Sequence, residues 1–180
     1  AVAISGGAVY AAGDLVAAGG KASWHIARWQ MPAAVTATIP PGGGGLASGY
    51  DNSAYTFSSG AFTSPVIITH TALLTGVPPT GLLAGISHFY AITATAVGSG
   101  APVQPLKPYT VSIVYDPADL GGAYAGGLAL YAWDGGQWLK EASSRVSVVS
   151  HTVIATPTHF SIWGVLGPAR KDAILPAIRR

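Results

Sequence analysis

Five histidines and seven carboxylates are the side chains most able to support catalysis or metal binding in this chain. A zinc site needs three or four converging ligands, usually at characteristic spacings. No two histidines stand two or four residues apart, so we expect hydrogen-bonding histidines on strands and no metal site. The five are His25, His70, His88, His151 and His159.

Two aspartates, Asp116 and Asp119, have a spacing that suits either a cation or the start of a helix. Together with loop carbonyls they could bind Ca²⁺. Pro117 favours the helix, because Asp116 can cap it and proline fits its first position. Gly121 follows and ends it. The sequence therefore predicts one helical turn here, and a plain turn at residues 51–53.

The common motifs of hydrolases and nucleotide-binding proteins are missing. No Gly-x-Ser-x-Gly motif is present to expose a nucleophilic serine. The glycine run 42–45 lacks the Lys-Ser/Thr that completes a phosphate-binding loop. It predicts a flexible joint instead. We therefore predict that the chain is not an enzyme acting on an external substrate and that it needs no cofactor.

Trp133 and Trp138 flank the turn Asp134-Gly135-Gly136, which joins two apolar stretches. Such a turn predicts a β-hairpin. Its two tryptophans would then form a cross-strand pair. Exposed on the surface, they would instead form a platform for a carbohydrate ligand, so both residues are also candidate ligand-binding residues.

The composition excludes several classes of protein. The chain has 180 residues, of which 49 % are hydrophobic and 9 % charged, and it has no cysteine. This excludes intrinsic disorder, which needs low hydrophobicity and high charge, and it excludes disulfide scaffolds and cysteine-ligated metals. Gly, Pro, Ser or Thr interrupts every apolar stretch, so we expect no transmembrane segment.

Charge is distributed very unevenly. Between Arg28 and Lys107 the sole charged residue is Asp51. No basic run is interleaved with aromatic residues, so a nucleic-acid partner is not expected. A surface of Thr, Ser, Gly and apolar groups is typical of proteins that pack against neighbouring molecules. The alternative is a monomer with a Thr/Ser-rich β surface carrying O-linked glycans.

Strand patterns recur throughout the chain, separated by Gly, Pro, Asp and Asn turns, and no helical period is sustained. The sequence predicts an all-β fold: a β-sandwich with Ig-like, Greek-key connections and an N-terminal β-hairpin extension. We expect an extension at 1–41, a sandwich at 46–167 and a basic tail at 168–180. The expected strands are 2–5, 8–11, 23–31, 34–39, 54–58, 61–73, 88–97, 109–115, 128–133, 137–141, 146–150, 152–156 and 159–166.

Several segments within residues 46–167 resemble the β-domain found in netrin receptors, ankyrins and zonula-occludens proteins, in the form carried by secreted bacterial proteins. In order, they are 54–71 (AYTFSSGAFTSPVIITHT), 85–90 (GISHFY), 102–111 (PVQPLKPYTV), 115–120 (YDPADL), 130–138 (LYAWDGGQW) and 158–167 (THFSIWGVLG).

Residues 1–30 resemble a single blade of bacterial β-propellers, on segments 3–14 (AISGGAVYAAGD) and 18–29 (AGGKASWHIARW). One blade cannot close a propeller, which has about four to eight. Together the two resemblances imply an extracellular, non-enzymatic β module at the cell surface.

The first resemblance also implies one chemical reaction. Relatives of this β-domain cleave themselves between the Phe and Ser of a tripeptide like His159-Phe160-Ser161. The Ser161 hydroxyl would attack the Phe160 carbonyl while His159 acts as base. The alternative is an ordinary strand, with Phe160 on one face and the other two residues on the opposite face.

The main functional expectation is an extracellular structural subunit that forms a homopolymer, either a filament or a surface layer. Strands of the N-terminal hairpin would add to the open sheet edge of a neighbouring copy. The alternative is a secreted adhesin or carbohydrate-binding module whose partner is a cell-surface polysaccharide. The expected assembly residues are Val2, Ile4, Val9, Tyr10, Trp24, Ile26 and Trp29.

Overall fold

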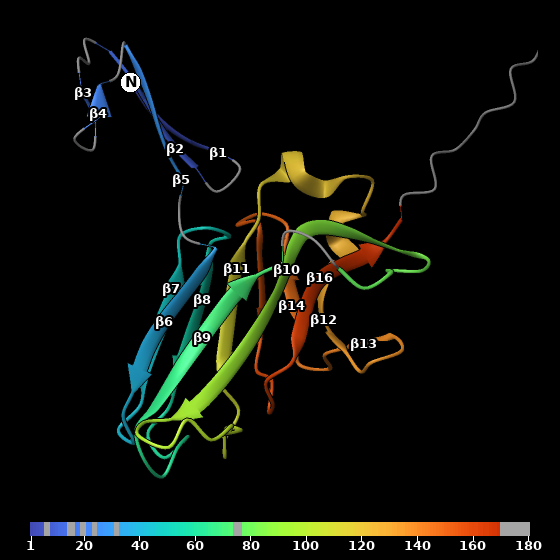
Figure 1. Ribbon diagram of the computed structural model, residues 1–180. Helices are drawn as coiled ribbons and strands as arrows, with labels where there is room; N and C mark the ends of the chain where they lie inside the picture. Colours follow the sequence, from blue (N-terminus) through green and yellow to red (C-terminus); the bar gives the residue numbers. More distant parts are fainter. Residues whose placement is uncertain are drawn as a thin grey trace, which may run out of the picture.

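The computed structural model describes most of the chain. The described residues are 1–5, 8–13, 17–18, 21–22, 25–30, 33–73 and 77–169. Two antiparallel sheets pack face to face and form a β-sandwich (Figure 1). The predicted all-β sandwich is therefore confirmed. None of the described helices is long and apolar enough to cross a membrane.

The larger sheet has six strands in the order β13-β12-β16-β10-β9-β6. Its neighbours are largely non-consecutive in sequence, since β16 returns to lie between β10 and β12. The strands are β6 (Ala34–Ile39), β9 (Val66–Ala72), β10 (Leu83–Ala96), β12 (Ala129–Trp133), β13 (Trp138–Lys140) and β16 (Ile162–Pro168).

The smaller sheet has five strands in the order β14-β15-β11-β8-β7. Alternate side chains of both sheets point inward, as period-2 strands require. Trp163 is the largest of the fully buried side chains. The strands are β7 (Gly44–Ser48), β8 (Ser53–Phe57), β11 (Thr110–Val114), β14 (Arg145–Ser147) and β15 (Thr152–Ala155).

The glycine run expected to form a flexible joint is instead a tight corner between the two sheets. Gly44 and Gly45 begin β7, and the Gly43 amide donates to the Pro40 carbonyl at 3.0 Å. A Cβ on Gly43 would lie 2.5 Å from the Phe57 carbonyl oxygen, so the backbones approach too closely for any side chain. The joint prediction is wrong, because Gly43 and Gly45 lie too close to the β8 backbone to carry a side chain.

The start of the sandwich also differs from the expected boundary. The extension expected at 1–41 includes residues 34–39, yet β6 pairs with β9 along its whole length. Periodicity identified this strand but carried no information on its partner. The sheet therefore begins at Ala34 rather than after the corner.

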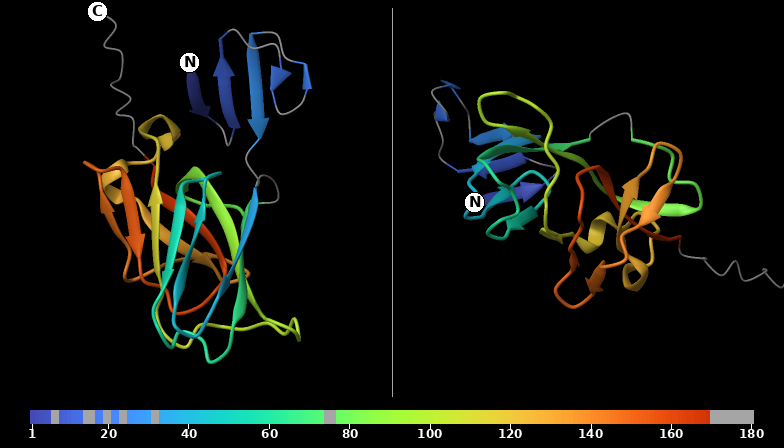
Figure 2. Two further views of the ribbon diagram at one scale, coloured as in Figure 1. Left: turned by 90° about the vertical axis from the view of Figure 1, so that its left-hand side faces the viewer. Right: turned by 90° about the horizontal axis from the view of Figure 1, so that it is seen from below.

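The N-terminal strands form a separate three-stranded sheet, in the order β1-β2-β5, beyond one end of the sandwich (Figure 2). The expected hairpin is present and a third strand joins it. The strands are β1 (Val2–Ser5), β2 (Ala8–Ala12) and β5 (Ile26–Gln30), with a short pair, β3 (Ala17–Ala18) and β4 (Lys21–Ala22), between β2 and β5 in the sequence.

The predicted helical turn is present as the 3₁₀ helix η1 (Pro117–Leu120). The Ala118 amide donates to the Asp116 carboxylate at 2.8 Å, and Gly121 ends the helix in a left-handed conformation. A second 3₁₀ helix, η2 (Ala125–Gly127), precedes β12. Of the basic tail, only Pro168 and Ala169 lie within the described residues.

Candidate functional site

A buried polar cluster joins the two sheets at Asp51. This residue lies in the turn between β7 and β8, so the predicted turn is confirmed. Its carboxylate is only 6 % exposed. One carboxylate oxygen accepts from the Ser53 amide at 3.3 Å. The other lies 3.0 Å from Nε2 of His70, a fully buried residue of β9 in the opposite sheet.

Tyr55 of β8 extends this cluster. Its hydroxyl lies 2.7 Å from Nδ1 of His70. The His70 ring therefore faces the Asp51 carboxylate through Nε2 and the tyrosine hydroxyl through Nδ1. The chain Asp51–His70–Tyr55 thus has the order of a catalytic relay, with tyrosine in the nucleophile's place.

The electrostatics of the cluster favour a structural role over a nucleophilic one. Burial raises the pKa of the Asp51 carboxyl, but the hydrogen bond and charge of His70, aided by Ser48 and His88, outweigh it. The pKa of Asp51 therefore lies below its ordinary 3.8. Burial, and then the Asp51 charge, raise the pKa of Tyr55 well above 10. Its hydroxyl stays protonated, and the side chain is buried away from any substrate.

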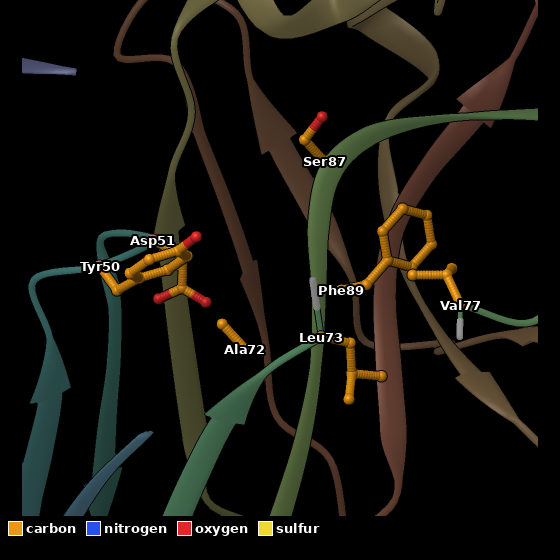
Figure 3. A pocket seen from close by; sticks show the side chains of 7 residues that line it. All are labelled: Tyr50, Asp51, Ala72, Leu73, Val77, Ser87 and Phe89. Carbon is orange, nitrogen blue, oxygen red and sulfur yellow. The ribbon is translucent and has the colours of Figure 1, made fainter. Parts of the chain in front are cut away.

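A pocket of about 340 Å³ opens beside Asp51 (Figure 3). Tyr50 and Asp51 border it on one side, and Ser87 and Phe89 of β10 line another part, with the Phe89 ring beside Val77. Ser87 has a φ of 64°, at an irregularity in the pairing of β10 with β16. Bulges and strained residues of this kind often border binding sites. The remaining lining residues are Ala72, Leu73 and Val77.

Sequence reasoning missed this cluster. The available signal was that Asp51 is the sole charge between Arg28 and Lys107. A single carboxylate in such a long uncharged stretch is a candidate for burial with a partner, but the partner, His70, lies on a different sheet. Among the described residues, this cluster included, no three His, Asp or Glu side chains gather closely enough to hold a metal ion.

The His159-Phe160-Ser161 tripeptide lies just before β16 rather than within a strand. Phe160 is buried among Phe57, Phe62 and Tyr109, with ring centroids 5.2 to 6.4 Å apart. Its amide donates to the Gln104 side chain at 2.7 Å, and the Tyr109 hydroxyl donates to the His159 carbonyl at 3.2 Å.

The side chains of Ser161 and His159 each contact a residue outside the tripeptide. The Ser161 hydroxyl donates to the Trp133 carbonyl at 3.2 Å. The His159 ring packs against Trp163, with centroids 5.2 Å apart. In this conformation, serine and histidine make contacts with other residues rather than with the Phe160 carbonyl.

Trp133 and Trp138 form the expected cross-strand pair. They are directly opposite in the β12–β13 hairpin, with ring centroids 5.5 Å apart and planes tilted by 57°. Trp138 Nε1–H donates to the Pro79 carbonyl at 3.1 Å, and its ring packs on Phe89. A tilt of this size is usual for an aromatic pair. The alternative role of the two rings as a carbohydrate platform stays a prediction.

The expected assembly residues lie in the N-terminal sheet as far as they are described. Val2 of β1 is 73 % exposed and Ile26 of β5 is 61 % exposed. The Arg28 guanidinium lies over the Tyr10 ring at 5.9 Å. Ile4, Val9 and Trp29 belong to β1, β2 and β5, but their side chains are not among those described, and Trp24 lies outside the described residues.

Comparison with known proteins adds no assignment to these features. The resemblances to the receptor, ankyrin and zonula-occludens β-domain and to a propeller blade therefore stay predictions from the sequence segments. No model of a known protein family matches this chain, and no curated protein matches it.

Proposed function

We propose that this protein is an extracellular structural subunit that assembles into a filament or surface layer. The N-terminal sheet of one copy adds its strands to the sheet edge of the next copy. Such an assembly needs neither disulfides nor surface charge, because main-chain hydrogen bonds and apolar contacts hold it together.

The observation that carries this proposal is the position of the N-terminal sheet. It lies beyond the end of the sandwich, and β1 and β5 are its outer strands (Figure 1). Their exposed Val2 and Ile26 would be shielded from water by a neighbouring molecule. An isolated two-stranded hairpin is only marginally stable, and each strand that is added to a small sheet stabilises it.

The surface of the sandwich supports the same proposal. Asp51, the sole charge between Arg28 and Lys107, is buried, so this long segment exposes no charged side chain among its described residues. The outer face of β6, β9 and β10 carries a row of directly opposite threonines, Thr36, Thr69 and Thr93. Monomeric proteins usually scatter charges over such faces.

The experiment is removal of residues 1–30, which leaves every strand of the sandwich in place. We expect the full chain to form polymers and the shortened chain to remain monomeric, by light scattering after size exclusion. Circular dichroism checks that the sandwich remains folded. Polymers of unchanged length from the shortened chain would refute assembly through the N-terminal sheet.

A second candidate function, a secreted adhesin or carbohydrate-binding module, is favoured by the pocket beside Asp51. Phe89 lines that pocket and packs on Trp138 at 5.7 Å, so a bound sugar would change tryptophan fluorescence. Titration with soluble polysaccharides tests this, with Trp138→Phe as the control variant. A flat titration of the wild type would exclude the pocket as a site for those sugars.

A further inference from the structure

We infer that the outer edge of β6 is the acceptor that pairs with β1 of a second copy of this chain. This inference rests on the proposed function and identifies the two strands that meet at each junction. It predicts a head-to-tail contact between two different edges, which propagates into an open chain of subunits.

The edges of the sandwich differ in how they are protected. The outer strands β13 and β14 carry Lys140 and Arg145, and charged residues at edges are a usual device against unwanted strand pairing. The outer strands on the opposite side, β6 and β7, carry no charge. β7 begins with Gly44-Gly45, which makes a poor strand template. β6 has the sequence AVTATI and contains neither Gly nor Pro, so it is the better acceptor.

The ladder between β6 and β9 defines which backbone groups of β6 face outward. The Ala72 amide donates to the Ala33 carbonyl at 2.7 Å, so residues 33 and 72 form a hydrogen-bonded pair. Bonded and non-bonded pairs alternate in an antiparallel ladder. The amide and carbonyl groups of Ala34, Thr36 and Thr38 therefore point away from β9. These three residues are also exposed.

The N-terminal sheet offers a matching donor strand. Of its two outer strands, β5 carries Arg28, whereas β1 (VAIS) carries no charged side chain. The Ala12 amide donates to the Ala1 carbonyl at 2.9 Å. By the same alternation, the backbone groups of Val2 and Ile4 point away from β2. Val2 is thus exposed in both its side chain and its outward main-chain groups.

The two edges are complementary in length and spacing. Val2 and Ile4 are two residues apart, as are Thr36 and Thr38, so antiparallel pairing forms two hydrogen-bonded pairs and about four hydrogen bonds. Neither strand carries a charged side chain that pairing would desolvate. Each copy carries the donor strand β1 on one sheet and the acceptor strand β6 on another. A chain of subunits therefore ends with an unused β1 at one end and an unused β6 at the other.

Proline substitutions test the two edges separately, because proline removes an amide donor from one side of a strand only. Thr36→Pro removes an outward amide of β6 and leaves the bonds to β9, while Val2→Pro does the same for β1. We expect each variant to raise the concentration needed for polymer at least about tenfold, the effect of losing one to two hydrogen bonds. Thr36→Ser, which keeps the amide, is the matched control and should polymerise as the wild type does.

A second pair of variants covers the case in which Thr36→Pro does not fold. Thr36→Lys places a charge on the β6 edge, and Thr93→Lys places the same charge on the same row of the sheet but on the central strand β10. We expect Thr36→Lys to reduce polymer and Thr93→Lys to leave the β1–β6 junction intact. Equal polymerisation of both lysine variants would overturn the inference.

Mixing the two proline variants gives the most specific result. The Thr36→Pro chain still has an intact donor strand, β1, and the Val2→Pro chain still has an intact acceptor strand, β6. The mixture should therefore form dimers of one Thr36→Pro chain and one Val2→Pro chain, and nothing longer. If two β6 edges paired with each other instead, Val2→Pro alone would dimerise and the mixture would show no mixed dimer. If the wild type and Thr36→Pro polymerise equally well, β6 is not the acceptor strand, and the proposed function is unaffected. If the wild type is monomeric, both the β6 acceptor and the proposed function are wrong.

Discussion

The Asp51 carboxylate and the His70 ring lie 3.0 Å apart across the core, one in the β7–β8 turn and the other on β9. Each sheet contributes one partner, so the contact fixes the position of one sheet relative to the other. Removal of one partner leaves a buried polar group without compensation, which costs more free energy than removal of both.

Asp51→Ala should therefore lower the free energy of unfolding by about 1–3 kcal/mol, the cost of a buried polar group that loses its partner. The double variant Asp51→Ala/His70→Leu should lose less than the sum of the two single variants, because the two residues interact. Urea denaturation measures both. Asp119→Ala, at an exposed carboxylate of η1, is the control, and a strictly additive double variant would show that the contact contributes nothing.

The same contact makes stability depend on acidity. The folded pKa of Asp51 lies below the ordinary 3.8 that it regains on unfolding. Its contribution is therefore fully present above pH 3.8 and is lost as the pH falls through the lower, folded value. Urea midpoints measured across this acidic range should fall less steeply in Asp51→Asn than in the wild type. If the urea midpoint falls equally steeply with pH in both proteins, folding does not lower the pKa of Asp51.

Gly164 of β16 makes room for two aromatic rings. A Cβ at this position would lie 2.8 Å from the Phe89 ring and 3.2 Å from the Trp138 ring. Gly164→Ala should therefore destabilise the fold by about 1–3 kcal/mol, as overpacking does. Gly42→Ala is the matched control, because a Cβ there meets nothing within 4 Å. Equal unfolding midpoints for the two variants would contradict the packing described here.

The Phe160–Ser161 bond should stay intact. Its serine hydroxyl donates to the Trp133 carbonyl, and the preceding amide is held by Gln104. Mass spectrometry under denaturing conditions should find a single species of 18.1 kDa after prolonged incubation. Two fragments that sum to this mass plus one water would show self-cleavage instead.

Local patterns in the sequence predicted the local structure well. The alternation in residues 34–39 predicted β6 with its bounds, the Asp116-Pro117 pair predicted the capped turn, and the Asp134-Gly135-Gly136 turn predicted the Trp133–Trp138 pair. Each of these depends on residues only a few positions apart. Short-range propensity and turn chemistry are sufficient to specify them.

Features that depend on distant partners were not predictable in this way. The burial of Asp51 depends on His70, nineteen residues away on another sheet. The role of Gly43 and Gly45 depends on the close approach of the β8 backbone rather than on their own flexibility. Periodicity shows which face of a strand is apolar, but not which strand lies beside it.

The assembly state of the native protein at neutral pH tests the central claim most directly. Light scattering after size exclusion gives the mass in solution, and negative-stain electron microscopy of the same sample gives the form of the assembly. Strand addition through β1 and β6 predicts long, regular filaments or sheets that shorten in Val2→Pro and Thr36→Pro. A homogeneous monomer near 18.1 kDa at all concentrations would contradict it.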